Sequence, residues 1–178
     1  MTGWRPGDRR PDAKSMLRVD QAGEYGATRI YAGQLAVLRR SCPEAKLIAR
    51  MAAQEERHLK RFNALVADRR ARPTALQPLW NVAGFALGAA TALMSEKAAL
   101  ACTDAVETEI DRHYAGQLAA LGDDDPELSA DIAEFQAEEL EHRDTAREAG
   151  SAQAVGYPLL TAAIRAGCRV AITLSKHI

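Results

Sequence analysis

The most restrictive feature of this chain is a Glu-x-x-His motif that occurs twice, at Glu55 and His58 and again at Glu139 and His142. Each motif interrupts a series of apolar residues spaced three and four apart, which is the pattern of the buried face of an α-helix. The two series are Ile48, Met51, Glu55, His58, Phe62, Leu65 and Leu128, Ile132, Phe135, Glu139, His142, Ala146. Two helices are therefore expected to carry a carboxylate and an imidazole into a hydrophobic core.

A single glutamate precedes each motif at nearly the same distance. Glu24 lies 31 residues before Glu55, and Glu107 lies 32 residues before Glu139. Both glutamates lie on apolar helical faces of their own, formed by Leu17, Glu24, Tyr31, Leu35, Leu38 and by Leu100, Thr103, Glu107, Ile110, Tyr114, Leu121. This internal repeat predicts a duplicated helical hairpin, and hence an all-α four-helix bundle with a pseudo-twofold axis.

Four carboxylates in one core require a counter-charge, because an unpaired buried carboxylate costs several kcal/mol or becomes protonated. No Lys or Arg shares these helical faces at the same level. Two divalent cations would supply the missing charge, and neutral imidazoles would complete their coordination. We therefore predict a two-metal centre, the arrangement found in ferritin-like bundles, whose ligands are Glu24, Glu55, His58, Glu107, Glu139 and His142.

One Glu-x-x-His pair alone would be weak support, because it also occurs by chance on solvated helix faces. The doubled pair with two matched upstream glutamates is far harder to obtain by chance. Carboxylate and imidazole ligands suit iron or manganese and do not distinguish between them. Ligand histidines usually donate their second ring N–H to an acceptor, for which Glu138 and Asp20 are candidates, whereas Glu56 and Glu141 lie off the apolar faces and are expected in solvent.

Composition agrees with a single helical domain. The 178 residues are 47% apolar but only 5% aromatic, and the net charge of −1 offers no basis for binding nucleic acid. Three widely separated cysteines form no metal or disulfide motif and are read as free thiols. Residues 1–14 are polar, lack a secretory signal and are expected to be a disordered arm, and residues 15–178 are expected to form one ferritin-like domain.

Five helical segments are predicted from periodicity and from Pro, Gly and Ser boundaries. Their expected ranges are 15–40, 43–70, 95–121, 126–149 and 157–176, and an apolar stretch over 79–94 lies between the second and the third. The segments 79–94 and 157–176 are additional to the four bundle helices and are apolar or amphipathic. The apolar core of the first, residues 80–94, is too short and glycine-rich to span a bilayer convincingly.

Several stretches resemble the demethoxyubiquinone hydroxylase family of ubiquinone biosynthesis. These are residues 18–27 (RVDQAGEYGA), 30–34 (IYAGQ), 54–60 (QEERHLK), 72–74 (RPT), 78–88 (PLWNVAGFALG), 101–103 (ACT), 138–142 (EELEH) and 166–172 (AGCRVAI), together with the pair His113 and Tyr114. The resemblance covers nearly all of the chain after residue 15. The long apolar motif and the glycine-flanked Glu24 are not shared with ferritins.

The resemblance implies a di-iron monooxygenase that uses O2 to hydroxylate the ring of a polyprenylated demethoxyubiquinol. Two iron ions per chain would be the cofactors, and an external donor would supply electrons. Glu55 and Glu139 would bridge the metals, while Glu24, His58, Glu107 and His142 would occupy outer positions whose pairing stays open. Tyr114 faces the core and is a candidate for electron or proton transfer or for packing alone, and His113 would lie near the site.

A polyprenyl substrate also implies contact with a membrane surface. Residues 80–94, and the last segment with Arg165 and Arg169 on one edge, suit burial in the interface. The alternative is that they cover the bundle core or a dimer interface. The expected location is the cytoplasmic side of a bacterial inner membrane, with the matrix side of the mitochondrial inner membrane as the alternative.

Two other functions remain open at this point. One is a different ferritin-like di-iron oxidase or an iron-storage protein, and the other is a non-catalytic helical scaffold. Homo-oligomerisation and association with other quinone-biosynthesis proteins are also left open.

Overall fold

The computed structural model describes residues 12–178, which form six α-helices, one short 3-10 turn and no strand. The elements are α1 (Ala13–Val37), α2 (Pro43–Asp68), α3 (Gln77–Met94), α4 (Glu96–Leu121), α5 (Pro126–Glu148), η1 (Ser151–Gln153) and α6 (Tyr157–His177). The predicted all-α class is confirmed.

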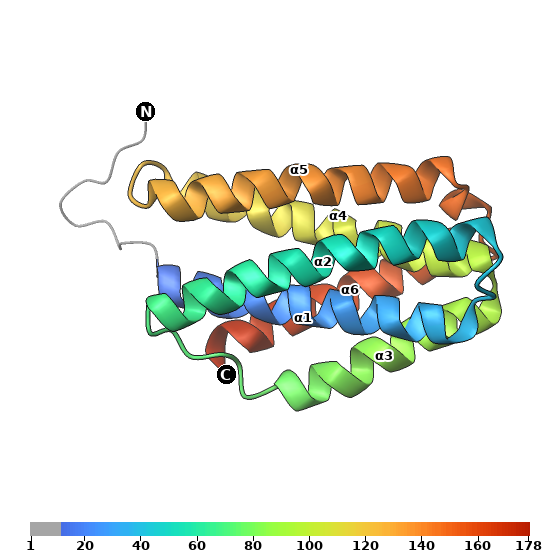
Figure 1. The fold of residues 1–178 in the computed structure, drawn as a ribbon, viewed down its shortest axis with the longest axis horizontal. Helices are drawn as coiled ribbons and strands as arrows, with labels where there is room; N and C mark the ends of the chain where they lie inside the picture. The colour runs from blue at the N-terminus through green and yellow to red at the C-terminus, as the bar shows by residue number, and fades with distance from the viewer. Residues whose placement is uncertain (1–11) are drawn as a thin grey trace.

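Helices α1, α2, α4 and α5 form the bundle (Figure 1). Within it, α1 pairs with α2 and α4 pairs with α5, so the two predicted hairpins are present. Helix α3 connects the hairpins and packs along α1, while α6 returns against α4 and α1. The fold is thus the expected ferritin-like four-helix bundle with two additional helices.

Helix α1 differs from its expected range at both ends. It begins at Ala13 because the Asp12 carboxylate accepts a hydrogen bond of 3.1 Å from the Ser15 backbone N–H and caps the helix. It ends at Val37 because Leu38 adopts an extended backbone conformation that buries its side chain. Of the arm expected at residues 1–14, residues 1–11 lie outside the described part of the chain.

The expected boundaries between the later helices follow local capping. Ser95 accepts a hydrogen bond from the Ala98 N–H and starts α4 directly after α3. Gly122 ends α4 with a positive φ of 51°, a conformation that glycine adopts without strain. Asp125 then caps α5, whose first residue is Pro126.

The helical faces predicted from sequence form the core. Its apolar residues divide into two large clusters, one containing Ile48, Met51 and Leu100 and the other containing Phe62, Ile132 and Phe135. In the chain, the Glu-x-x-His motifs separate the α2 and α5 members of the two clusters. The polar residues therefore occupy the middle of the bundle rather than one end.

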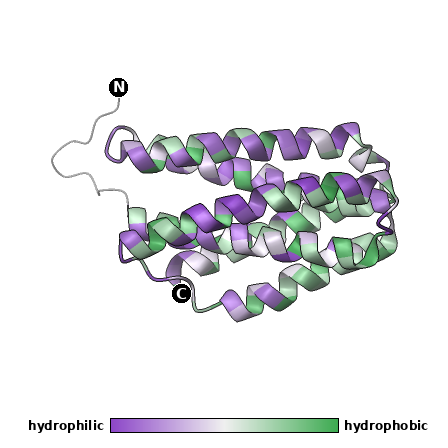
Figure 2. Ribbon diagram, viewed as in Figure 1, coloured by the Kyte–Doolittle hydropathy of each residue, from purple (hydrophilic) through white to green (hydrophobic). Residues whose placement is uncertain are grey.

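Helix α3 lies unusually close to α1. A Cβ added to Gly88 would overlap the Ile30 carbonyl oxygen, and one added to Gly33 would overlap that of Phe85. After its first turns, α3 is coloured white to green, the hydrophobic end of the scale, in Figure 2, and its side chains Leu93 and Val82 are 75% and 67% exposed. No helix within residues 12–178 combines the length and hydropathy needed to cross a membrane.

Candidate metal centre

All six predicted ligands meet in the bundle core, and none is more than 1% exposed. Their side chains form two groups that each bring four ligand atoms within 4.8 Å of one another. Glu24, Glu55, His58 and Glu139 form the first group, and Glu55, Glu107, Glu139 and His142 form the second. Glu55 and Glu139 thus belong to both groups, while each remaining glutamate is paired with one histidine.

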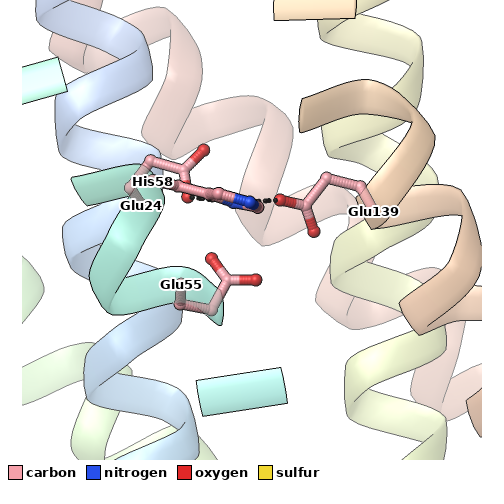
Figure 3. Close-up of side chains that lie close together, drawn as sticks. All are labelled: Glu24, Glu55, His58 and Glu139. Carbon is pink, nitrogen blue, oxygen red and sulfur yellow. Dashed lines mark ion pairs between the residues drawn. The ribbon is translucent and has the colours of Figure 1, made fainter. Parts of the chain in front are cut away.

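The first group is held by α1, α2 and α5 (Figure 3). The Nδ1 atom of His58 lies 3.0 Å from Glu139 Oε1 and 3.5 Å from Glu24 Oε2. The carboxylate of Glu55 points into the same space from one turn along α2 (Figure 3).

The second group has α4 in place of α1, and the contacts of its histidine are to the two glutamates common to both groups. The Nδ1 atom of His142 lies 3.2 Å from Glu55 Oε1 and 3.2 Å from Glu139 Oε2. The two oxygens of Glu139 therefore face different histidines. A carboxylate in this position could contact one cation beside each histidine.

The residues present fit a pair of cations. Each of the six side chains has at least one buried polar atom without a hydrogen-bond partner, and those of His58 and His142 are Nδ1. A small divalent cation holds its ligands at about 2.1 Å, so neighbouring ligand atoms lie about 3 Å apart and opposite ones about 4.2 Å apart. The observed separations of 3.0 to 3.5 Å match neighbouring ligands.

The electrostatics also call for positive charge. Burial, and then repulsion from Glu139, raise the pKa values of Glu55 and Glu107 well above the usual range. Burial lowers the pKa of His58, but Glu139 and Glu24 outweigh it and raise that pKa to about 10. Without a metal the core must hold protons on several of these groups, and bound cations would replace them.

The second nitrogen of each histidine has its own acceptor. His58 Nε2 lies 2.7 Å from Glu138 Oε2, and His142 Nε2 lies 2.9 Å from Gln54 Oε1. When the ring is neutral and its proton is on Nε2, Nδ1 would be the atom available to a metal ion. Asp20, the other candidate acceptor, instead contacts His113 Nε2 at 3.2 Å and accepts a hydrogen bond from Gln117.

Two tyrosines hold the outer glutamates. Tyr114 donates a hydrogen bond to Glu24, and Tyr31 donates one of 2.7 Å to Glu107. Burial, and then the neighbouring carboxylate, raise the pKa of both phenols well above the usual value. Both phenols therefore stay protonated and act as donors.

Sequence reasoning did not assign roles to Tyr31 and Gln54. Both could have been found from the internal repeat, because Tyr31 and Tyr114 each lie seven residues after an outer glutamate. Likewise, Gln54 and Glu138 each directly precede a Glu-x-x-His motif.

The residues expected outside the centre lie outside it. Glu56 and Glu141 are exposed. Arg165 and Arg169 lie one turn apart on α6, are partly exposed, and both donate to the buried carboxylate of Glu109, at 2.7 and 2.8 Å. These contacts attach α6 to α4.

A cavity of about 540 Å³ lies between α1, α3, α4 and α6. Its walls are almost wholly apolar and include Val19, Ile30, Leu87, Val106, Ile110 and Ile164. Trp80 and Ser175 also line the cavity, and a hydrogen bond of 3.0 Å from Trp80 Nε1 to Ser175 Oγ links α3 to α6.

A second, small hollow, too narrow to hold a water molecule, lies between the cavity wall and the candidate ligand Glu107. It shares Ala27, Ile30 and Val106 with the cavity wall, and it is also lined by Tyr31 and Glu107. The apolar cavity therefore adjoins the second ligand group at its outer glutamate.

The family and the relatives that this chain resembles all have names that refer to ubiquinone biosynthesis or to hydroxylation of its demethoxy precursor. Residues 11–175 match the family described as "Ubiquinone biosynthesis protein COQ7". A Rhodospirillum rubrum protein named 3-demethoxyubiquinol 3-hydroxylase is 57% identical over 175 residues, covering 97% of this chain and 82% of the relative. A human protein named NADPH-dependent 3-demethoxyubiquinone 3-hydroxylase, mitochondrial, is 50% identical over 92% of this chain and 76% of its own length. A Saccharomyces cerevisiae protein named 5-demethoxyubiquinone hydroxylase, mitochondrial, is 44% identical, with 92% and 77% covered.

Proposed function

This chain belongs to the COQ7 family of ubiquinone biosynthesis proteins, and we propose that it is a 3-demethoxyubiquinol 3-hydroxylase that uses two iron ions and O2. The observation that supports the metal-dependent chemistry is the placement of Glu139, whose two oxygens face His58 and His142. Four buried carboxylates with two imidazoles would neutralise and hold two divalent cations. Manganese would fit the same ligands, so the identity of the metal as iron is a separate part of the proposal.

The proposed reaction converts a ring C–H and O2 into a ring C–OH and water, and it consumes two electrons and two protons. The bound metal pair would supply the activation of O2. We propose that Glu55 and Glu139 bridge the pair, and that Glu24 with His58 and Glu107 with His142 hold its two sides. The electrons come from an external donor, and the name of the human relative makes NADPH the first donor to test.

The chain's own residues would then bind and orient the quinol. The apolar cavity suits a polyprenyl tail, because each methylene transferred from water gains about 0.8 kcal/mol. The ring would lie at the part of the cavity wall formed by Ala27, Ile30 and Val106, which is the part nearest to Glu107. Tyr114 is protonated and bonded to Glu24, so it is placed to keep that ligand oriented or to pass on a proton.

We further propose that the protein works at the membrane that contains its substrate. Support comes from the exposed apolar side chains of α3 and α6, the helices that also line the cavity. Leu93, Val82, Leu159 and Val170 are each more than half exposed. A face of this kind favours an interfacial position.

Co-sedimentation with liposomes tests this position. A Val82→Glu and Leu93→Glu double variant should lose most binding, whereas Ala53→Glu and Ala137→Glu on exposed sites of α2 and α5 should retain it. Equal binding of both double variants would contradict the proposed membrane face.

The metal centre is tested by metal analysis of protein produced with iron. We expect two iron ions per chain, a marked loss in Glu139→Gln, and no loss in Glu56→Gln, which makes the same change at an exposed position. Binding of well under one metal ion per chain would contradict the centre. Uptake far above two would favour iron storage.

The reaction is tested with reduced, iron-loaded protein under anaerobic conditions. Addition of O2 and a demethoxyubiquinol should give the hydroxylated quinol in a yield set by the iron content. A loaded protein that consumes O2 without hydroxylated product would retain the metal centre but exclude the proposed reaction.

A further inference from the structure

The two ligand histidines are supported by equivalent positions of the internal repeat. His58 on α2 contacts Glu138 on α5, and His142 on α5 contacts Gln54 on α2. Each acceptor directly precedes a glutamate common to both ligand groups. The pseudo-twofold symmetry therefore extends beyond the six ligands to the groups that orient them.

The chemistry of these two acceptors is different. Glu138 is a carboxylate that also accepts a hydrogen bond of 2.7 Å from Arg57, which fixes its orientation. Gln54 is a neutral amide. A carboxylate acceptor draws the Nε2 proton more strongly and makes the imidazole a better electron donor at Nδ1 than an amide does.

The packing around the two imidazole rings also differs, and it holds His58 more firmly than His142. His58 stacks on Phe135, with 4.1 Å between ring centroids and 27° between planes. The repeat places Met51 where Phe135 lies in the other half, because each precedes a Glu-x-x-His motif by four residues. Met51 is flexible and offers no ring to stack on. His58 is thus held by both a charged acceptor and an aromatic face.

From these differences we propose that Glu138 and Gln54 are positioning residues that make the two metal positions unequal. The position formed with Glu24 and His58 binds its cation more tightly, and the position formed with Glu107 and His142 binds second. The weaker position is also the one whose outer glutamate, Glu107, lines the small hollow next to the cavity wall.

This inference rests on the metal centre proposed above but not on the quinol reaction. Changes to the groups that support metal-bound histidines alter metal affinity by about 10- to 100-fold. We therefore expect the two dissociation constants of the wild-type protein to differ by about that factor.

The first measurement is an anaerobic titration of metal-free protein with Fe(II), and in parallel with Co(II), followed by calorimetry and absorption. Two unequal binding steps are expected. Two equal steps would overturn the inference while leaving the two-metal centre intact, whereas the absence of binding would overturn the centre itself.

Substitutions then test the cause of the difference. Glu138→Gln should weaken the first step about tenfold or more and bring the two steps together. Gln54→Glu should strengthen the second step. Glu141→Gln is the matched control, because it removes the same charge from α5 at an exposed position, and both steps should be unchanged. An equal effect of Glu141→Gln and Glu138→Gln would attribute the difference to net charge and overturn the proposal.

The order of filling is tested by Mössbauer spectroscopy with one equivalent of 57Fe(II) followed by one of 56Fe(II). The wild-type protein should show mainly one ferrous doublet, which His58→Ala removes and His142→Ala retains. The Glu138→Gln, Gln54→Glu double variant keeps the net charge and should move the 57Fe signal to the other doublet. Circular dichroism verifies folding, and an unchanged doublet in a folded double variant would contradict the proposal.

Discussion

Tyr31 on α1 donates a hydrogen bond of 2.7 Å to Glu107 on α4, across the core between the two hairpins. Tyr114 on α4 makes the reciprocal bond to Glu24 on α1. Each outer glutamate is thus oriented by the helix that carries the other one. The tyrosines link the hairpins at the level of the six proposed ligands.

Replacing Tyr31 with Phe should therefore destabilise the protein without disturbing its packing. The substitution leaves Oε1 of Glu107 without its phenolic donor, and a buried polar group without a partner costs about 1–3 kcal/mol. Denaturant unfolding of the metal-free protein measures this loss. Tyr25→Phe is the control, because Tyr25 lies on the same helix and is only partly buried. Similar losses in the two variants would argue against a special role for the Tyr31 hydroxyl.

The metal-free protein should become less stable as the pH rises from about 6.5 to 9. Burial lowers the pKa of His58 in the folded protein, but the carboxylates of Glu139 and Glu24 outweigh burial and raise this pKa from 6.5 to about 10. The unfolded chain loses this proton near pH 6.5 while the folded chain retains it, so raising the pH favours unfolding.

Glu55 and Glu107 act in the same direction, because burial raises the pKa values of both carboxyls in the folded state. Burial lowers the pKa of His142, so the titration of this residue changes stability only at pH values below its usual pKa of 6.5. Thermal unfolding across this pH range, with and without Fe(II), measures the effect. Stability of the metal-free protein that rises with pH would contradict it, and added metal should reduce or reverse the slope.

Filling the apolar cavity should impair use of a long-tailed substrate. Gly26 lines the cavity and has no atom near an added Cβ, so Gly26→Leu can be accommodated by the fold while it occupies the cavity. Displacing only two methylene groups of the tail costs about 1.6 kcal/mol, which is more than tenfold in kcat/KM.

The comparison substrate is a demethoxyubiquinol with a short tail, whose kcat/KM should change little. Gly116→Leu is the control, because Gly116 is an exposed helical glycine with similar space that does not line the cavity. Metal content should be normal in both variants. An equal loss for long and short tails would place the tail elsewhere.

Adding one methyl group to Gly88 should loosen α3. The new Cβ would overlap the Ile30 carbonyl oxygen, and neither backbone can move without separating α3 from α1. Such overpacking costs about 1–3 kcal/mol. Gly116→Ala should instead stabilise the protein by up to about 1 kcal/mol, since alanine is the better residue in an exposed helix. Thermal unfolding of the two variants should give shifts of opposite sign.

The elements and the core were predictable from sequence because they depend on local periodicity. The faces around Glu55 and Glu139 are buried as expected, and the bundle helices end within a few residues of their predicted limits. Gln54 and Tyr31 were also accessible in principle, since the repeat relates them to Glu138 and Tyr114. The partner of Asp20 was not, because His113 reaches it from α4, 93 positions along the chain.

The amino-acid sequence by itself determined that six polar side chains would lie in the middle of an apolar bundle, because helical spacing alone assigns residues to a face. Only the tertiary structure decided that Glu24 is grouped with His58 and Glu107 with His142, and that Glu139 lies between the two histidines. It also decided that Arg165 and Arg169 contact Glu109 and that four helices line the cavity. These relationships depend on the rotation and offset of helices that are distant in sequence, and periodicity within one helix carries no information about either.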